Sequence, residues 1–191
     1  SLSDQVLSNL KKGHTRHDFF DALDILRGAG IALRPSWVAF TPWTTLADYL
    51  DMLETIEKEG LVDTVDPVQL SIRLLVPPGS SLLANSDIMR YVQGFDQPNF
   101  YYRWSHPDPR MDDLHKAISR VVEEGTACQE DSHSTFEAIR LLVLKSMGRN
   151  ERRAAPRMPI NRRKLPRLTE SWFCCSEPTR EQLAPLEATT T

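Results

Sequence analysis

Two apolar segments, residues 31–40 and 68–76, constrain the fold of this chain more than any other feature of its sequence. Both are rich in bulky apolar side chains and predict strands, although Pro35 interrupts the first. The capping pair Thr45 and Asp48 predicts a helix between them. Strands separated by such a helix pair in parallel, and a parallel sheet needs cover on both faces. The segments therefore predict an α/β fold.

The rest of the sequence adds helices and one long irregular segment. Capping residues and helical spacing predict four further helices, which begin at Asp4, Thr15, Asp108 and Ser134. Residues 77–108 are dense in Pro and aromatic side chains, and residues 99–104 within them are a candidate third strand. Because so few strands cannot complete a parallel sheet, the sequence predicts part of a larger α/β layer whose other strands lie before Ser1.

Composition indicates a folded protein with an uneven charge distribution. Apolar residues make up 40% and charged residues 26% of the 191 residues, which is enough to bury a core. The net charge of −3 divides into −7 over residues 1–148, +7 over residues 149–168 and −3 over residues 169–191. No apolar run is long enough to span a bilayer, and no secretory signal is visible. Three cysteines make no disulfide framework, so we expect a cytoplasmic protein with no membrane partner.

Several short motifs resemble the second half of a radical S-adenosylmethionine (SAM) barrel, over about residues 1–85. They are Asp4-Gln5-Val6-Leu7, Lys12-Gly13-His14-Thr15, Ala29-Gly30-Ile31, Thr44-Thr45-Leu46-Ala47-Asp48 and Pro78-Gly79-Ser80. The end of the chain is more specific. Residues Trp172-Phe173-Cys174-Cys175-Ser176-Glu177-Pro178 resemble the tail of the CUAEP/CCAEP-tail radical SAM proteins, with Ser176 where the family has Ala. The second cysteine position of that tail, here Cys175, can be selenocysteine.

The resemblance implies a six-stranded partial (βα) barrel that holds a four-iron four-sulfur cluster and SAM. Cleavage of SAM at the cluster gives a radical that abstracts hydrogen from a substrate, which the motifs do not identify. The family holds its cluster with three cysteines spaced C-x-x-x-C-x-x-C, and the sequence contains no such triplet. The resemblance therefore implies that an N-terminal barrel half is the partner, and that this chain alone binds neither cofactor and is inactive.

The expected organisation has three parts. Residues 1–85 form the C-terminal half of a radical SAM-like barrel, with parallel strands. Residues 86–148 form a loop and a helical region. Residues 149–191 form an extended, basic, Pro/Arg-rich tail that ends in the Cys-Cys-Ser-Glu-Pro motif.

Cys174 and Cys175 are the candidate catalytic residues. Adjacent cysteines seldom bridge each other without strain, so they suit redox exchange or soft-metal binding. The proposed role is a thiolate nucleophile or an electron-transfer thiol, and Cys175 is preferred because it matches the selenocysteine position. The alternative is two ordinary thiols, and a thiol oxidoreductase is disfavoured because C-x-x-C spacing is absent.

Arg34 and Arg73 are the candidate cofactor-binding residues. Each lies within a predicted strand, where a charge is costly unless it is paired. A guanidinium that points into a barrel binds the carboxylate of SAM or of a substrate through paired hydrogen bonds. The alternative, which the sequence favours slightly, is that each arginine pairs with an Asp or Glu of a helix.

Trp37, Trp43, Gln69 and Ser71 are the candidate substrate-binding residues. The two tryptophans lie near the end of the first predicted strand, where barrel sites are built, although packing is the commoner use of Trp. Strand alternation places Gln69 and Ser71 on the face of Arg73, which would make that face polar. Residues 94–107 are either a lid over a substrate or a passive cover.

Other site classes are weaker. The five histidines show no metal-ligand spacing, so no metal site is expected. The basic strip of residues 149–167 lacks interleaved aromatic residues, which makes nucleic acid an unexpected partner. A non-enzymatic interaction module is the alternative function, and open sheet edges would let the chain associate with itself.

Overall fold

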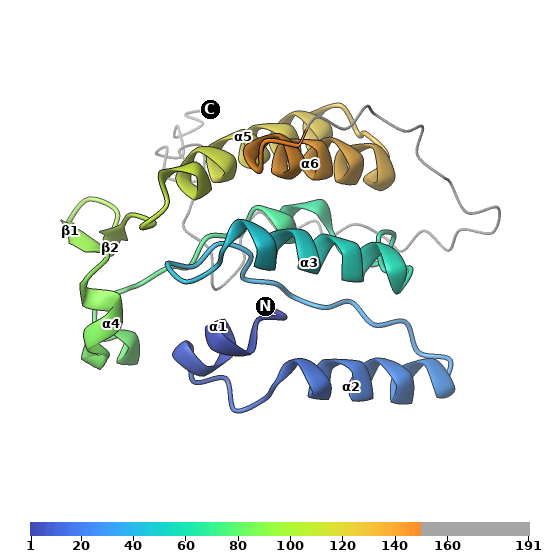
Figure 1. The fold of residues 1–191 in the computed structure, drawn as a ribbon, viewed down its shortest axis with the longest axis horizontal. Coiled ribbons are helices and arrows are strands. Elements are labelled where there is room, and N and C mark those ends of the chain that lie inside the picture. Colours follow the sequence, from blue (N-terminus) through green and yellow to red (C-terminus); the bar gives the residue numbers. More distant parts are fainter. Residues whose placement is uncertain (150–191) are drawn as a thin grey trace, which may run out of the picture.

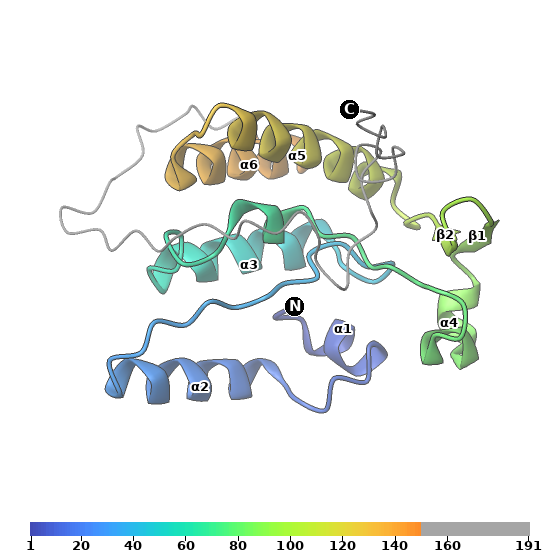
Figure 2. The same ribbon diagram turned by 180° about the vertical axis from the view of Figure 1, so that it is seen from behind.

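The computed structural model describes residues 1–149, which form a mainly helical body with a projecting arm (Figure 1). Helices α1 (Asp4–Asn9) and α2 (Arg16–Gly28) lie on one side, α3 (Leu46–Lys58) lies in the middle, and α5 (Pro109–Ala127) and α6 (Ser132–Ser146) lie on the other side. The view from behind shows the same three tiers, with residues 31–40 running between α2 and α3 (Figure 2).

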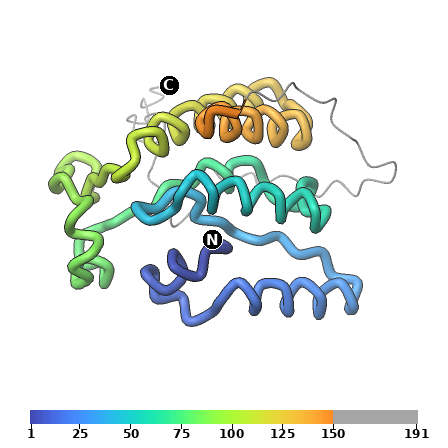
Figure 3. The backbone as a smooth tube through the Cα atoms, viewed as in Figure 1, coloured from blue at the N-terminus to red at the C-terminus, as the bar shows by residue number. Residues whose placement is uncertain are grey.

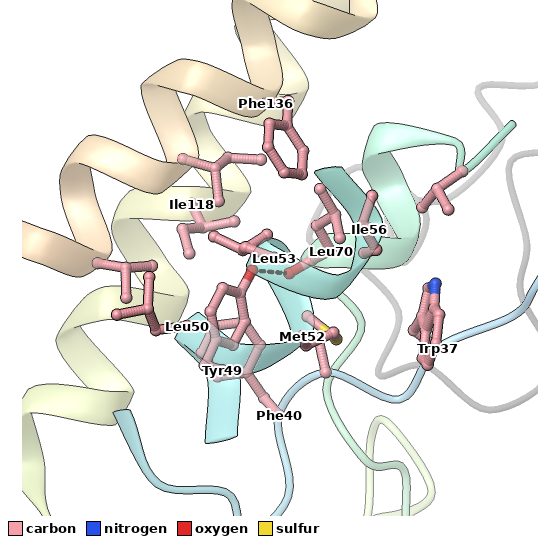
Figure 4. Close-up of a cluster of buried hydrophobic side chains, with 14 of the residues drawn as sticks. Trp37, Phe40, Tyr49, Leu50, Met52, Leu53, Ile56, Leu70, Ile118 and Phe136 are labelled. Atoms are coloured by element: carbon pink, nitrogen blue, oxygen red, sulfur yellow. Dashed lines mark hydrogen bonds between the residues drawn. The ribbon is translucent and has the colours of Figure 1, made fainter. Parts of the chain in front are cut away.

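The core lies where α3 meets α5, α6 and the short 3-10 helix η1 (Pro67–Leu70) (Figure 4). Leu53, Ile56, Ile118 and Ile139 are completely buried there. Tyr49 is also fully buried, and its hydroxyl donates a hydrogen bond to the carbonyl oxygen of Leu70. Burial raises the pKa of Tyr49 well above its usual value of 10.0, so the phenol stays protonated and keeps this bond.

Helix α2 contacts the body through Leu23, the partly buried Phe19 and two ion pairs. Leu23 is its only buried residue. Arg16 pairs with Asp51 of α3, and Arg27 donates to the Glu59 carboxylate over 2.7 Å. Ion pairs with this much exposure contribute little to stability, so α2 is held less firmly than the helices around the core.

Two helices begin at the caps that the sequence predicts, Thr45 and Asp108. The hydroxyl of Thr45 accepts a hydrogen bond from the backbone N–H of Asp48 over 3.1 Å, and the Asp108 carboxylate accepts from the N–H of Arg110 over 3.0 Å. The predicted cap at Ser134 is wrong. The cap of helix α6 is Asp131, three residues earlier, where its carboxylate accepts from the N–H of His133 over 3.0 Å.

The prediction of an α/β fold with a parallel barrel half is wrong. The one sheet among residues 1–149 is antiparallel and has two strands, β1 (Val92–Asp96) and β2 (Tyr101–Trp104). Residues 31–40 are extended but meet the second predicted strand at a single parallel bridge. There, the N–H of Phe40 donates to the Ile72 carbonyl over 2.9 Å, and the N–H of Leu74 donates to the Phe40 carbonyl over 2.8 Å.

Two local features explain why these segments are not strands. Pro35 has no N–H, and the N–H of Trp37 donates to the Gln69 side chain over 3.0 Å instead of to a neighbouring strand. The start of the second segment is wound into η1, which Pro67 opens and the Asp66 carboxylate caps. Trp37, Ala39 and Phe40 of the first run and Ile72 and Leu74 of the second are therefore buried without forming a ladder of backbone hydrogen bonds.

Residues 81–104, called the arm below, project at one end of the body (Figure 3). The arm contains the 3-10 helix η2 (Ser81–Ala84), α4 (Ser86–Met89), β1 and β2. The candidate third strand therefore exists as β2, but it forms a hairpin rather than part of a parallel sheet. No helix among residues 1–149 combines the length and the apolar character needed to cross a membrane.

Candidate functional site

A buried polar cluster lies where the arm, residues 71–76 and α5 meet. We call it the Arg73 cluster, and its members are Arg73, Trp104, His106, Asp112 and His115. Charged and polar groups are costly to bury without partners, so the contacts of each member decide what the cluster can do.

Arg73 is 9% exposed and is engaged from two sides. One guanidinium nitrogen donates to the Asp112 carboxylate and another donates to the Trp104 carbonyl, each over 2.8 Å. The guanidinium carbon also lies 3.6 Å from the centre of the Trp104 ring, which is a close cation–π contact. The carboxylate partner of Arg73 in this structure is thus a residue of α5.

Asp112 serves two partners. Its second oxygen accepts a hydrogen bond from the backbone N–H of His106 over 3.1 Å, while the first is bonded to Arg73. The imidazole Nδ1 of His106 lies 2.9 Å from the N–H of Asp108, the residue that caps α5. The other imidazole nitrogen, Nε2, is buried and has no hydrogen-bond partner among residues 1–149.

His115 lies on α5, one turn after Asp112. Its Nε2 lies 3.2 Å from the Ser71 carbonyl, to which it donates, and its ring packs edge-on against Phe40 at 4.9 Å. Burial, and after it the charge of Arg73, lowers the pKa of His115 from 6.5 to about 4. The His115 imidazole is therefore neutral at pH 7 beside the positively charged Arg73.

The structure separates the two candidate cofactor-binding arginines. Arg34 is exposed, whereas Arg73 is buried opposite Phe40. Six residues of extended chain between Arg34 and Phe40 correspond to about 20 Å of backbone, which separates the two residues along the fold. For Arg73 the geometry matches the alternative interpretation, in which the arginine pairs with a carboxylate of a helix.

Two candidate substrate-binding residues are brought together, but within the core. Trp37 and Gln69 are 3% and 4% exposed and are joined by the hydrogen bond to the Trp37 backbone. The indole Nε1 of Trp37 is buried without a hydrogen-bond partner among the described residues. The other two candidates lie apart from this bond. Trp43 is half-buried and packs against the apolar cluster of the arm. The Ser71 hydroxyl donates to the Val68 carbonyl over 2.9 Å.

The predicted polar strand face of Gln69, Ser71 and Arg73 does not exist. Gln69 belongs to η1, so the alternation of a strand does not apply to it. Cys174 and Cys175 lie outside the described residues.

The described residues do not fit the cofactors that the radical SAM resemblance implies. Among residues 1–149, no group of three or more His, Cys, Asp or Glu side chains is arranged to hold a metal ion. Cys128, the cysteine within this range, is exposed at the end of α5. Arg73 is already bonded to Asp112 and Trp104, so its geometry is not that of an open clamp for the carboxylate of SAM.

Asp112 and Trp104, the partners of Arg73, and His115 nearby were not among the residues predicted from the sequence. A usable signal was present in α5, where Asp112 and His115 alternate with the apolar residues of the buried face. Polar residues at such positions indicate a buried partner. Nothing local to the sequence identified that partner as Arg73.

Comparison of the chain with protein-family models, with curated proteins and with solved structures finds no match.

Proposed function

We propose that this chain is the C-terminal part of a radical SAM enzyme of the CUAEP/CCAEP-tail kind. In this proposal an N-terminal half holds the iron–sulfur cluster and SAM, and this chain supplies structure on the substrate side together with a thiol-bearing tail. The observation that carries the proposal is the motif of residues 172–178, in the same chain as Lys12-Gly13-His14-Thr15. Cys174 and Cys175 are the proposed redox thiols.

The Lys12-Gly13-His14-Thr15 motif forms a turn that its own contacts hold. Gly13 has a φ of +70°, a conformation that favours glycine. The His14 imidazole Nδ1 lies 3.2 Å from the Lys12 carbonyl, and the Asp18 carboxylate accepts from the N–H of Thr15 over 2.7 Å. The motif residues therefore form one turn that joins α1 to α2.

The test uses the natural polypeptide that contains this chain, purified anaerobically from its source with an antibody against residues 1–149. We expect a mass about twice 21.8 kDa or larger. After reconstitution with iron and sulfide, dithionite as electron donor should support formation of 5′-deoxyadenosine from SAM, and the preparation without dithionite should not. A polypeptide near 21.8 kDa that takes up no iron would contradict the proposal.

A non-enzymatic interaction module is the second candidate, and exposed apolar side chains favour it. Large apolar residues that are well exposed lie on α2, on the following segment and on the arm: Ile25, Ile31, Met89, Phe95 and Phe100. Phe95 and Phe100 lie together, with ring centres 5.7 Å apart, and contiguous exposed apolar groups are typical of surfaces that bind other molecules. This function is favoured over the enzyme if the purified natural polypeptide has a mass near 21.8 kDa and carries no iron.

A further inference from the structure

The arm has a small hydrophobic cluster that is separate from the main core. Ile88 and Trp104 of the arm form it together with Leu74 and Val76, and none of the four belongs to the core around α3. Partly buried body residues, among them Val38, pack against its edge. The arm therefore packs onto residues 74–76 and a few neighbouring body side chains, and not onto the core around α3. A segment attached in this way can open without unfolding that core.

The packing of the secondary-structure elements shows the same division. Within the arm, β1 packs on β2 and α4 packs on η2. Within the body, α6 packs on α3, α5 and η1, and α5 packs on η1. The ribbon shows the arm at one end of the molecule, joined to the body on the side of α5 (Figure 1).

Polar contacts hold the arm to the body at this junction. Arg73 donates a hydrogen bond to the Trp104 carbonyl and contacts the Trp104 ring. It also donates to the Asp112 carboxylate on α5. The Trp104 indole donates to the Leu74 carbonyl over 2.8 Å, and the N–H of Tyr102 donates to the Val76 carbonyl over 2.8 Å. One guanidinium therefore connects the last strand of the arm to the helix that follows it.

We propose that Arg73 is a latch, and that loss of its contacts with Asp112 and Trp104 lets the arm open as a unit while the helical body stays folded. This inference is independent of the proposed enzymatic function. Opening would move an aromatic face relative to the body, because Phe95 and Phe100 are 38% and 67% exposed on the hairpin with ring centres 5.7 Å apart.

Hydrogen exchange of the full chain, followed by NMR, tests the latch. In Arg73→Gln, we expect the Tyr102 amide to exchange at least about tenfold faster than in the unaltered chain, because breaking a buried ion pair is strongly destabilising. The amides of Leu53 and its neighbours in α3 should keep their exchange rates. Asp112→Asn should give the same pattern, since it removes the other half of the pair and keeps the shape of the side chain.

Arg16→Gln is the matched control, because Arg16 also pairs with an aspartate, Asp51, but joins α2 to α3. It should speed exchange in α2 and leave Tyr102 unchanged. The latch is refuted if both Arg73→Gln and Asp112→Asn leave the Tyr102 rate unchanged. It is also refuted if they raise the rates of Tyr102 and of α3 together or unfold the whole chain, because the arm would then not open separately.

Discussion

Acid should destabilise this protein through His115, and Arg73 explains part of the effect. The His115 ring lies between Phe40 and the Ser71 carbonyl, in the neighbourhood of the Arg73 guanidinium. A proton on this ring would add a second positive charge to a buried site where Arg73 already carries one. For this reason, and because of burial, the pKa of His115 falls from 6.5 to about 4.

The sign and size of the effect follow from linkage. Because the pKa is lower in the folded state, the unfolded chain binds the extra proton between about pH 6.5 and pH 4. Stability is therefore fully present above pH 6.5 and is lost as the pH falls towards 4. At about 1.4 kcal/mol for each pKa unit, the total loss is about 3 kcal/mol.

The assay compares urea unfolding of the unaltered chain and of His115→Gln from pH 4 to pH 8, followed by tryptophan fluorescence. Glutamine keeps an N–H donor for the Ser71 carbonyl but does not titrate. The difference in free energy of unfolding between the two proteins should shift by about 3 kcal/mol in favour of the variant between pH 8 and pH 4. Carboxylates common to both proteins cancel in this difference.

His17→Gln is the control, because the His17 side chain is 83% exposed. The same measurements on this variant give the effect of replacing a histidine that is not buried. Parallel stability curves for the unaltered chain and His115→Gln would refute the argument, since the folded protein would then accept a proton at His115 as readily as the unfolded chain.

Four further substitutions, one of them a control, test the fold by urea unfolding at pH 7. Trp104→Phe removes the indole donor from the Leu74 carbonyl and should cost about 1–3 kcal/mol. Leu53→Ala leaves a cavity at a fully buried site and should cost about 2–5 kcal/mol, whereas Ile25→Ala, at a side chain that is 71% exposed, should change stability by less than about 0.5 kcal/mol. Thr45→Ala removes the cap of α3 and should cost about 1 kcal/mol; an unchanged midpoint would show that the cap bond contributes nothing.

Local signals predicted the helices well, because a cap and its partner lie within a few residues of each other. The caps at Thr45 and Asp108 are examples. The two strand predictions were wrong because the same apolar residues suit either a strand or an irregular segment. Trp37 shows the difference, since its backbone N–H is taken by a side chain that lies 32 residues away in the sequence.

The Arg73 cluster shows how far sequence analysis reaches into a site. An arginine among bulky apolar residues predicts a buried cation that needs a partner, and the structure contains this cation. The choice of partner depends on how the chain folds back over 39 residues to bring Asp112 to Arg73. No periodicity or cap specifies that pairing.

The position of the cluster explains why polar residues suit this junction. Residues 31–40 meet residues 72–74 at Phe40, and the cluster packs against this contact through His115. An apolar side chain in place of Arg73 could pack there but would not select one arrangement of its neighbours. The guanidinium bonds a carbonyl of β2 and a carboxylate of α5, and these directional bonds orient the arm and the helix relative to the bridge. Arg73 therefore positions these three segments, and the same contacts make it the residue whose loss should free the arm.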